Sequence, residues 1–275
     1  MASMSSPLLV ITGGGQGLGA AVVRKFADSN WKCIILDKNA KPANDLQDEL
    51  GKTNVPNVIE CDVASTPQVD AAFRSIAKEH KSIDALVNNA GIVRPGPSHE
   101  VEDEDWMELV NVHMGGTMRV SRAGIGLLLA SQSPSIVNIS SVCAALGFPG
   151  RLSYNASKAG IEAITRTLAT EWGESGVRVN AVAPGFILTE ASKIIYESKT
   201  ADIKVRAGRT TLGRLGRPSE VAEAVFWLSS ELSSYVTGQV LVVDGGFLIE
   251  GSTGPDSTYR SPESIRSTAR IKPLN

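Results

Sequence analysis

Short runs of consecutive apolar residues alternate along this chain with longer segments in which apolar residues recur at three- and four-residue spacing. Unbroken apolar runs lie at 8–11, 33–36 and 240–243, and apolar segments with one or two polar residues lie at 57–61, 83–87, 135–139 and 177–183. Such runs are typical of parallel strands that are buried on both faces. The periodic segments predict helices at about 20–27, 43–51, 66–80, 104–130, 153–172 and 219–228. The alternation predicts an α/β fold with a doubly wound, mostly parallel seven-stranded sheet.

The length and the composition narrow the class of protein. A chain of 275 residues can bury one full α/β core, so we expect a single domain over 1–250. From Gly251 onward Ser, Thr, Pro and Arg replace large apolar residues. The tail 251–275 is therefore expected to be disordered or to lie against a neighbouring subunit.

The charge balance gives no reason to expect nucleic acid or a membrane as a partner. The chain has 27 basic and 29 acidic residues, a formal net charge of −2, and no basic patch interleaved with aromatic residues. Its N-terminus lacks the pattern of a secretory signal, and its three scattered cysteines favour a reducing compartment. We expect a soluble cytoplasmic protein. The three histidines are far apart and no Cys/His cluster accompanies them, so no metal site is predicted.

A glycine-rich turn follows the first strand and leads at once into a helix. Glycines in this position let the backbone turn tightly and approach a ligand, while the helix N-terminus presents unpaired N–H groups to a pyrophosphate. The three key glycines are Gly13, Gly17 and Gly19, a spacing that departs from the usual G-x-G-x-x-G. Because a glycine-rich turn alone is often merely a turn, the prediction needs support from the next strands.

The second and later strands end in residues that suit a dinucleotide. Asp37 ends the second strand, where its carboxylate can accept hydrogen bonds from an adenosine ribose and repel a 2′-phosphate. This position predicts NAD in preference to NADP, although the neighbouring Lys38 softens the preference. Asp62 either approaches the adenine or simply begins a loop. Small and amide residues at 88–91 suit a backbone that lies against a ligand.

A tyrosine and a lysine lie four residues apart in the helix predicted over 153–172. Tyr154 and Lys158 therefore share one helix face. An ammonium close to a phenol favours the phenolate and lowers the pKa of the tyrosine from its ordinary value of about 10. Such a tyrosine can exchange a proton with an alcohol or a carbonyl oxygen.

In its motifs the chain resembles the short-chain dehydrogenase/reductase family over residues 7–248. The motifs that carry the resemblance keep the family's order and spacing: Thr12–Gly19, Asp62-Val63, Asn88–Gly91, Asn111, Ser141, Tyr154-x-x-x-Lys158, Asn180, Pro184-Gly185 and Asp244–Gly246. The resemblance implies a Rossmann fold and an NAD(P)-dependent oxidoreductase. It also implies a homotetramer, with the helices at 104–130 and 153–172 either at the interface or in the core.

The resemblance also implies roles for individual residues. Tyr154 would be the general acid/base and Lys158 would hold the ribose. Ser141 would position the substrate oxygen and Asn111 would join a water-linked proton relay to the lysine. The residues and the resemblance together predict a cofactor site formed by Gly13, Gln16, Gly17, Leu18, Gly19, Asp37, Asp62, Val63, Asn89, Ala90, Gly91, Tyr154, Lys158, Pro184, Gly185, Ile187 and Thr189.

The substrate pocket is expected between the loop 142–152 and the polar, weakly patterned segment 186–215, which would cover the substrate. Ser141, Cys143, Arg151 and Phe186 are its predicted lining residues. Cys143 is expected to be a small apolar wall residue. Arg151 either pairs with a carboxylate or phosphate of the substrate or is a solvated loop residue.

The sequence thus predicts interconversion of a secondary alcohol and a ketone with NAD(H) and without a metal. One alternative is a 3-oxoacyl-thioester (acyl carrier protein) reductase that uses NADPH. An alternative from another class is a non-catalytic dinucleotide sensor on the same fold. A sugar-nucleotide epimerase would need a substantial further substrate domain.

Overall fold

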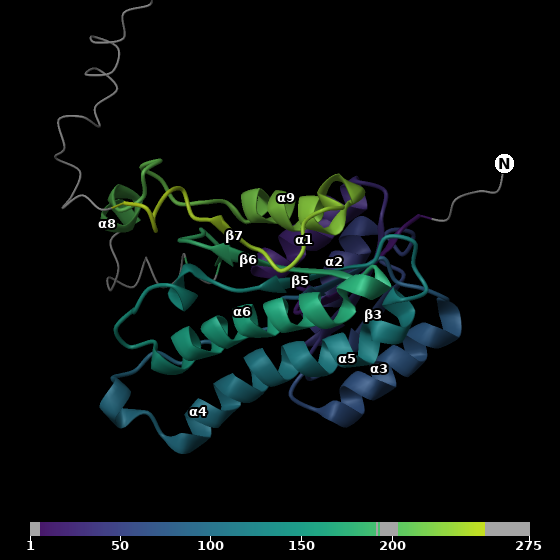
Figure 1. Cartoon of the computed structure of the whole chain (residues 1–275), viewed down its shortest axis with the longest axis horizontal. Coiled ribbons are helices and arrows are strands. Elements are labelled where there is room, and N and C mark those ends of the chain that lie inside the picture. The colour runs from purple at the N-terminus through teal and green to yellow at the C-terminus, as the bar shows by residue number, and fades with distance from the viewer. Residues whose placement is uncertain (1–5, 191, 193–202, 251–275) are drawn as a thin grey trace, which may run out of the picture.

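The computed structural model describes residues 6–190, 192 and 203–250 (Figure 1). The tail 251–275 lies outside the described residues, as does most of the middle of the predicted covering segment. None of the helices in the described part of the chain is long and apolar enough to cross a bilayer.

The apolar runs form one sheet in which every neighbouring pair of strands is parallel, as the sequence predicted. The strand order is β3-β2-β1-β4-β5-β6-β7. The strand bounds are β1 (Leu8–Thr12), β2 (Lys32–Asp37), β3 (Asn57–Glu60), β4 (Ala85–Asn88), β5 (Ser135–Ile139), β6 (Arg178–Pro184) and β7 (Val240–Val243). The order reverses between β1 and β4, and ligands of such sheets bind at the carboxyl ends of the strands beside this reversal.

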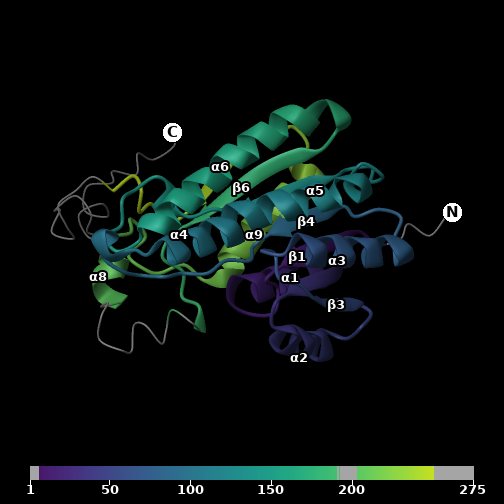
Figure 2. The same cartoon turned by 90° about the horizontal axis from the view of Figure 1, so that it is seen from below.

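Helices cover both faces of the sheet (Figures 1 and 2). One face carries α1 (Gly17–Asp28), α2 (Ala40–Leu50) and α9 (Pro218–Ser229). The other face carries α3 (Thr66–Glu79), α4 (Asp103–Val110), α5 (Gly116–Leu128) and α6 (Leu152–Trp172). The remaining short elements are η1 (Ser98–Glu100), η2 (Asn111–Gly115), η3 (Val142–Ala144), η4 (Gly173–Ser175), α8 (Ile203–Gly208) and η5 (Glu231–Ser233).

Alternate residues of the central strand enter two separate cores. Leu9 and Ile11 of β1 pack in the cluster that includes α1 and α9. Leu8 and Val10, which point to the opposite face, pack in the cluster that includes α3 and α5. Because side chains alternate across a strand, a strand covered on both faces is expected to be apolar at most positions. This requirement explains the unbroken apolar runs of the sequence.

The long helix predicted over 104–130 is divided in the structure. A π-helical turn, η2, separates α4 from α5. A π turn accommodates one more residue per turn than an α-helix and shifts the faces of the residues around it. Apolar spacing alone does not reveal such a shift, so the sequence predicted one continuous helix.

An aromatic cluster joins the first and the last long helices. The ring of Phe26 in α1 lies 5.0 Å from that of Trp31 and 5.1 Å from that of Phe226 in α9, with edge-to-face geometry. Phe26 is fully buried, whereas the other two rings are partly exposed. Phe26 is therefore the centre of the packing between the two ends of the domain.

We expect Phe26→Ala to lower the free energy of unfolding by about 3–5 kcal/mol, because it removes buried aromatic area and leaves a cavity. Urea denaturation followed by circular dichroism measures this change. Tyr235→Ala is the matched control, since Tyr235 is fully exposed, and it should change stability by less than about 0.5 kcal/mol. Equal effects of the two substitutions would contradict the central position of Phe26.

Candidate active site

The glycine-rich turn between β1 and α1 folds so tightly that it excludes side chains. Gly13 and Gly17 have φ angles of +64° and +56°, in the left-handed region that favours glycine. A Cβ atom on Gly19 would lie 2.0 Å from the carbonyl oxygen of Gly13. The turn is therefore a cradle of bare backbone in front of the N-terminus of α1.

The end of β4 is hydrogen-bonded to this turn. The hydroxyl of Thr12 accepts from the backbone amides of Asn89 at 3.0 Å and Ala90 at 3.1 Å. The side-chain amide of Asn89 donates to the carbonyl oxygens of Gly13 at 2.8 Å and Thr12 at 3.1 Å. Asn89, predicted as a cofactor residue, thus uses its amide to hold two loops together.

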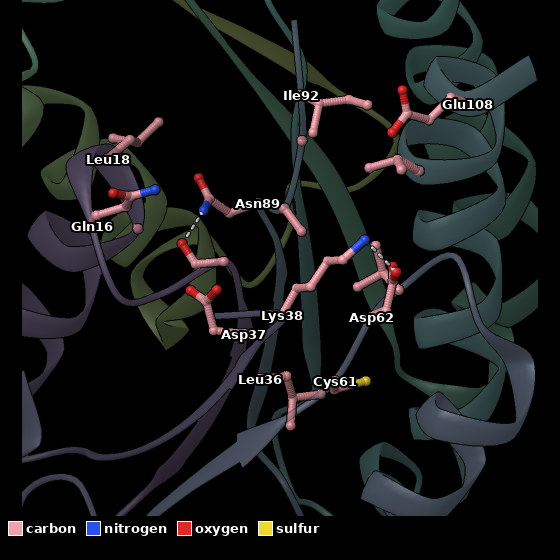
Figure 3. Close-up of a pocket in the computed structure, with 16 residues that line it drawn as sticks. Gln16, Leu18, Leu36, Asp37, Lys38, Cys61, Asp62, Asn89, Ile92 and Glu108 are labelled. Atoms are coloured by element: carbon pink, nitrogen blue, oxygen red, sulfur yellow. Dashed lines mark hydrogen bonds and ion pairs between the residues drawn. The ribbon is translucent and has the colours of Figure 1, made fainter. Parts of the chain in front are cut away.

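A cavity of about 320 Å³ opens beside the turn at the carboxyl ends of the strands (Figure 3). Most of the predicted cofactor residues of the N-terminal half line it. The lining residues are Gly13, Gln16, Leu18, Gly19, Leu36, Asp37, Lys38, Cys61, Asp62, Val63, Asn89, Ala90, Gly91, Ile92, Glu108 and Val112. Gln16 also lines an adjacent hollow together with Gly17 and Thr189. The structure therefore brings the first and later parts of the predicted cofactor site to one edge of the sheet.

Two acidic side chains face this cavity from different strands. The Asp37 carboxylate accepts from the backbone amides of Gly15 and Asn39, both at 3.1 Å. Lys38 reaches across the cavity to Asp62, and their charged atoms are 2.8 Å apart (Figure 3). Desolvation raises the pKa of Asp62 and the ion pair with Lys38 lowers it. The net result is a lowered pKa. The two carboxylates thus differ, because only that of Asp62 is neutralised by a lysine.

Three of the four predicted catalytic residues meet where β5 ends against α6. Lys158 donates to the carbonyl oxygen of Ile139, with its Nζ atom 2.6 Å away. The same Nζ atom lies 5.5 Å from the centre of the Tyr154 ring. Ser141 follows β5, and its hydroxyl accepts from the backbone amide of Cys143 at 3.2 Å. Helix α6 and strand β5 therefore hold the tyrosine, lysine and serine side by side.

Burial dominates the acid–base properties of this pair. It raises the pKa of Tyr154 to about 12, against the opposing effects of the Ser141 hydroxyl and the Arg151 charge. Burial also lowers the pKa of Lys158 to about 8. The sequence predicted a lowered pKa for the phenol, whereas in this chain its net pKa is raised, because burial is the largest effect on it. The physical reasons are the partial desolvation of the phenol and the direction of the ammonium, which donates to the Ile139 carbonyl.

The fourth predicted residue points elsewhere. Asn111 begins the π turn η2, and its side-chain oxygen accepts from the guanidinium of Arg119. Arg119 also donates to the carbonyl oxygens of Asn111 at 3.1 Å and Val63 at 3.3 Å. Among the described residues, no hydrogen bond joins Asn111 to Tyr154 or Lys158. The structure therefore separates Asn111 from the other three, because the π turn directs its side chain toward α5.

The side chain that η2 directs toward the tyrosine is His113. Its ring centre lies 5.5 Å from that of Tyr154 with the planes at 85°, and the residue is 1% exposed. Sequence reasoning considered His113 only as a metal ligand. The signal that could have found it is periodicity: Leu109, Thr117 and Val120 are buried at helical spacing around it. A histidine on that face had to be buried against α6.

The predicted substrate side is aromatic. Phe186, which follows β6, lies 4.8 Å from Phe247 and 6.2 Å from Phe148 between ring centres. Sequence reasoning selected only the first of these three residues. The guanidinium groups of Arg206 and Arg209 lie 4.8 and 5.0 Å above the rings of Phe186 and Phe247. The predicted wall of the substrate pocket is thus formed by aromatic rings from three separate segments, and two guanidinium groups lie against these rings.

The other predicted substrate residues border the tyrosine. Burial raises the pKa of the Cys143 thiol, as is expected of a wall residue rather than of a nucleophile. Arg151 precedes α6 and is partly exposed, and its charge acts on both Tyr154 and Cys143. Its position is compatible with either predicted role.

The segment after β6 is fixed by close backbone packing, an isolated β-bridge and a local hydrogen bond. Pro184 ends β6, and a Cβ atom on Gly185 would lie 2.7 Å from the Cα atom of Asp244. Ile187 forms an isolated parallel bridge with Gly216. The amide of Thr189 donates to the hydroxyl of Ser192 at 2.8 Å. These contacts place the predicted nicotinamide-side residues at the same edge of the sheet as the glycine-rich turn.

In the ranges that the structure describes, no three His, Cys, Asp or Glu side chains form a group that could hold a metal ion.

Comparison with known proteins gives consistent matches over the whole domain. A family model described as enoyl-(acyl carrier protein) reductase matches residues 13–248. A 3-oxoacyl-[acyl-carrier-protein] reductase of Thermotoga maritima is 36% identical, over 90% of this chain and 99% of the relative. A D-threitol dehydrogenase of Mycolicibacterium smegmatis is 32% identical, over 90% of this chain and 95% of the relative.

Solved structures agree with these matches. A gluconate 5-dehydrogenase from Burkholderia cenocepacia, crystallised in complex with NADP and tartrate, superposes with a TM-score of 0.82 at 32% identity. The match covers 90% of this chain and 96% of that protein. An aldohexose dehydrogenase of Thermoplasma acidophilum superposes with the same TM-score of 0.82 and 32% identity, over 92% and 97% of the two chains.

The buried lysine makes stability depend on pH in a defined direction. Lys158 has a pKa of about 8 in the folded protein, whereas a lysine in an unfolded chain has a pKa of about 10.4. Between these values the unfolded chain binds more protons, so stability rises with pH. From pH 8 to pH 10 we expect the wild type to gain roughly 2 kcal/mol in the free energy of unfolding relative to Lys158→Met.

Urea denaturation at several pH values, without added dinucleotide, measures this difference. Lys78→Met, at an exposed position of α3, is the control and should follow the pH dependence of the wild type. If Lys158→Met and the wild type had parallel pH profiles, the buried ammonium would not have the lowered pKa.

Proposed function

This chain belongs to the short-chain dehydrogenase/reductase family of NAD(P)-dependent oxidoreductases that act on CH–OH groups, and we propose that it interconverts a secondary alcohol and a ketone with NAD(H). The observation that carries the proposal is the meeting of Ser141, Tyr154 and Lys158 at the end of β5. The ring of His113 contacts both Tyr154 and Gly91, which is part of the cavity wall. The enzymatic relatives leave no support for a non-catalytic dinucleotide sensor.

The residues of the cavity fit a nicotinamide dinucleotide. Cβ atoms on Gly13 and Gly19 would overlap neighbouring backbone, so the turn presents bare backbone at these positions, next to the N-terminus of α1 where a pyrophosphate would bind. Residues 89–91 would lie against the cofactor, and Ile187 and Thr189 would contact its nicotinamide end. When bound, the dinucleotide supplies the hydride acceptor or donor.

The proton transfer is assigned to Tyr154. When a ketone is reduced, its phenol oxygen gives a proton to the carbonyl oxygen, and when an alcohol is oxidised it receives one. A high phenol pKa favours the form that donates. The Ser141 hydroxyl would orient the substrate oxygen. Lys158, which is cationic below a pH of about 8, would stabilise the phenolate and bind the ribose.

The preference for NAD over NADP rests on Asp37. Its carboxylate is held at the cavity by two backbone amides, so a 2′-phosphate placed there would meet an uncompensated negative charge. Lys38, the cation that would attract a phosphate, is paired with Asp62. The gluconate 5-dehydrogenase from Burkholderia cenocepacia, in contrast, was crystallised with NADP, so the preference for NAD is tested directly below.

A 3-oxoacyl-thioester reductase is the second candidate. The Thermotoga maritima relative and the description of the family model favour it. The cationic groups over Phe186 and Phe247 would suit a substrate that carries an anionic group. Because a 3-oxoacyl-thioester reductase would use NADPH, the cofactor preference also bears on the choice between the two candidate functions.

We also propose a homotetramer that works in the cytoplasm. Exposed apolar side chains lie along the helical layer of α4, α5 and α6 and include Met107, Met118, Leu129 and Leu152. Such residues are suited to an interface between copies of the chain. The free thiols of Cys33, Cys61 and Cys143 suit a reducing compartment. We assign 1–250 to one oxidoreductase domain.

The cofactor proposal is tested by fluorescence titration with NADH and NADPH. We expect the wild type to bind NADH more tightly, and Asp37→Ala to weaken NADH binding about tenfold while it narrows or reverses the preference. Asp37→Asn removes the charge and keeps one of the two acceptor oxygens that Gly15 and Asn39 use, so comparison with Asp37→Ala separates the charge from part of the hydrogen bonding. A wild type that prefers NADPH would make the acyl-thioester reductase the leading candidate.

The catalytic proposal is tested by Tyr154→Phe, which removes only the phenol oxygen. With a panel of secondary alcohols and NAD, and of 3-oxoacyl thioesters and NADPH, we expect kcat to fall by about 10²–10⁴-fold while dinucleotide binding stays unchanged. Tyr235→Phe, at a fully exposed position, should leave kcat at the wild-type value. Full activity of Tyr154→Phe on the substrate that the wild type accepts would refute the assignment.

A further inference from the structure

We propose that His113, rather than Asn111, is the positioning residue that completes the proton-transfer site, with its Nδ1 atom as the hydrogen-bond acceptor for the proton-carrying groups around Tyr154 and Lys158. This inference rests on the proposed function, because it concerns the proton transfer assigned to Tyr154.

The backbone directs the histidine into the site. His113 lies in the middle of η2, the π turn between α4 and α5, and four residues after the buried Leu109. Turns of this kind are rare and occur frequently at functional sites. The wider turn places His113 against α6, where its ring meets the ring of Tyr154 edge to face at 5.5 Å. Asn111, in the same turn, is engaged by Arg119 instead.

One ring nitrogen of His113 forms a hydrogen bond, and this bond determines which of the two ring nitrogens carries the proton. The Nε2 atom lies 2.8 Å from the carbonyl oxygen of Ile92. A carbonyl oxygen only accepts, so Nε2 carries the proton and Nδ1 of the neutral ring is an acceptor. The amide of Ile92 is more distant, at 3.3 Å, and an Nε2–H group cannot accept from it. The loop after β4 thereby fixes the tautomer.

The acceptor that remains is buried and has no protein partner. Nδ1 belongs to the few buried side-chain polar atoms of the described residues that lack a hydrogen bond. Buried polar atoms in proteins are usually satisfied by protein or by ordered water, so an exception inside an active site calls for a functional reason. A donor supplied during the reaction, by the Lys158 ammonium or by one water molecule, would satisfy Nδ1.

The surroundings keep the ring neutral and in place. Burial, followed by the charge of Lys158, lowers the pKa of His113 to about 4, so Nδ1 stays an acceptor at working pH. The titratable groups that face the ring are Tyr154 and Lys158 from α6, since Gly91 and Ile92 on its other side carry no charge. A Cβ atom on Gly91 would lie 2.5 Å from Cε1 of the ring. The cofactor cavity and the histidine are therefore in direct contact through Gly91.

The test compares His113→Leu, which removes both nitrogens, with His113→Asn, which restores a short polar side chain. We expect His113→Leu to lower kcat about 10²-fold, with KM and the Kd for NADH within about threefold of wild type. The pH at which kcat for alcohol oxidation reaches half its maximum should rise, because a poorly held ammonium stabilises the phenolate less. His113→Asn should recover at least tenfold in kcat.

His80→Leu is the matched control. His80, at the C-terminal end of α3, also has a buried ring nitrogen without a partner, but it lies outside the candidate site. This variant should leave kcat and its pH profile unchanged. Equal losses in His113→Leu and His113→Asn without a shift of the pH profile would assign the histidine to packing alone and overturn the proposal, as would an unaltered kcat in His113→Leu.

A second measurement is independent of turnover and so separates this inference from the proposed function. In protein labelled at histidine and lysine nitrogens, NMR should show a neutral His113 protonated at Nε2, and the pKa of Lys158 should fall in His113→Leu. A ring protonated at Nδ1, or a Lys158 pKa unaffected by His113→Leu, would refute the inference even if Tyr154 proved catalytic. The expected shifts in an inactive protein would uphold the geometry and place the error in the proposed reaction.

Discussion

The close approach of the β1–α1 turn to the end of β4 is the constraint on which the site depends. At Gly19 a side chain would begin 2.0 Å from the carbonyl oxygen of Gly13. The hydroxyl of Thr12 and the amide of Asn89 close this junction with hydrogen bonds of 2.8 to 3.1 Å. Because the sheet order reverses between β1 and β4, this junction is also where a cavity opens, so packing and ligand binding use the same bare backbone.

The second half of the site is organised around a buried cation. Lys158 is 4% exposed and its ammonium donates to the carbonyl oxygen of Ile139 at the end of β5. An ammonium away from water is costly, and the depressed pKa of about 8 expresses that cost. The same burial raises the pKa of Tyr154 to about 12, so the pKa values of the two groups, which are ordinarily similar, are driven apart. Perturbed acid–base groups of this kind, beside a cavity, are typical of catalytic sites.

The π turn between α4 and α5 links these two halves. It sends Asn111 toward Arg119 and His113 toward Tyr154, while Gly91 brings the wall of the cavity against the histidine ring. One irregular turn therefore decides which polar side chain reaches the proton-transfer site. A regular helix through the same residues would have oriented them differently, since one additional residue per turn rotates the residues around it.

By itself the sequence determined the fold, because strands covered on both faces are mostly apolar and the apolar residues of a packed helix recur every three to four residues. It also predicted that Gly19 and Asp37 lie at one edge of the sheet, where the structure places both in the wall of one cavity, since the carboxyl ends of parallel strands share an edge. The spacing of His113 from the buried Leu109 and Thr117 could have indicated its burial, but only the tertiary structure placed its ring against Tyr154 and the side chain of Asn111 against Arg119. Only burial, a property of the folded chain, decided that the pKa of Tyr154 rises although Lys158 lies one turn away.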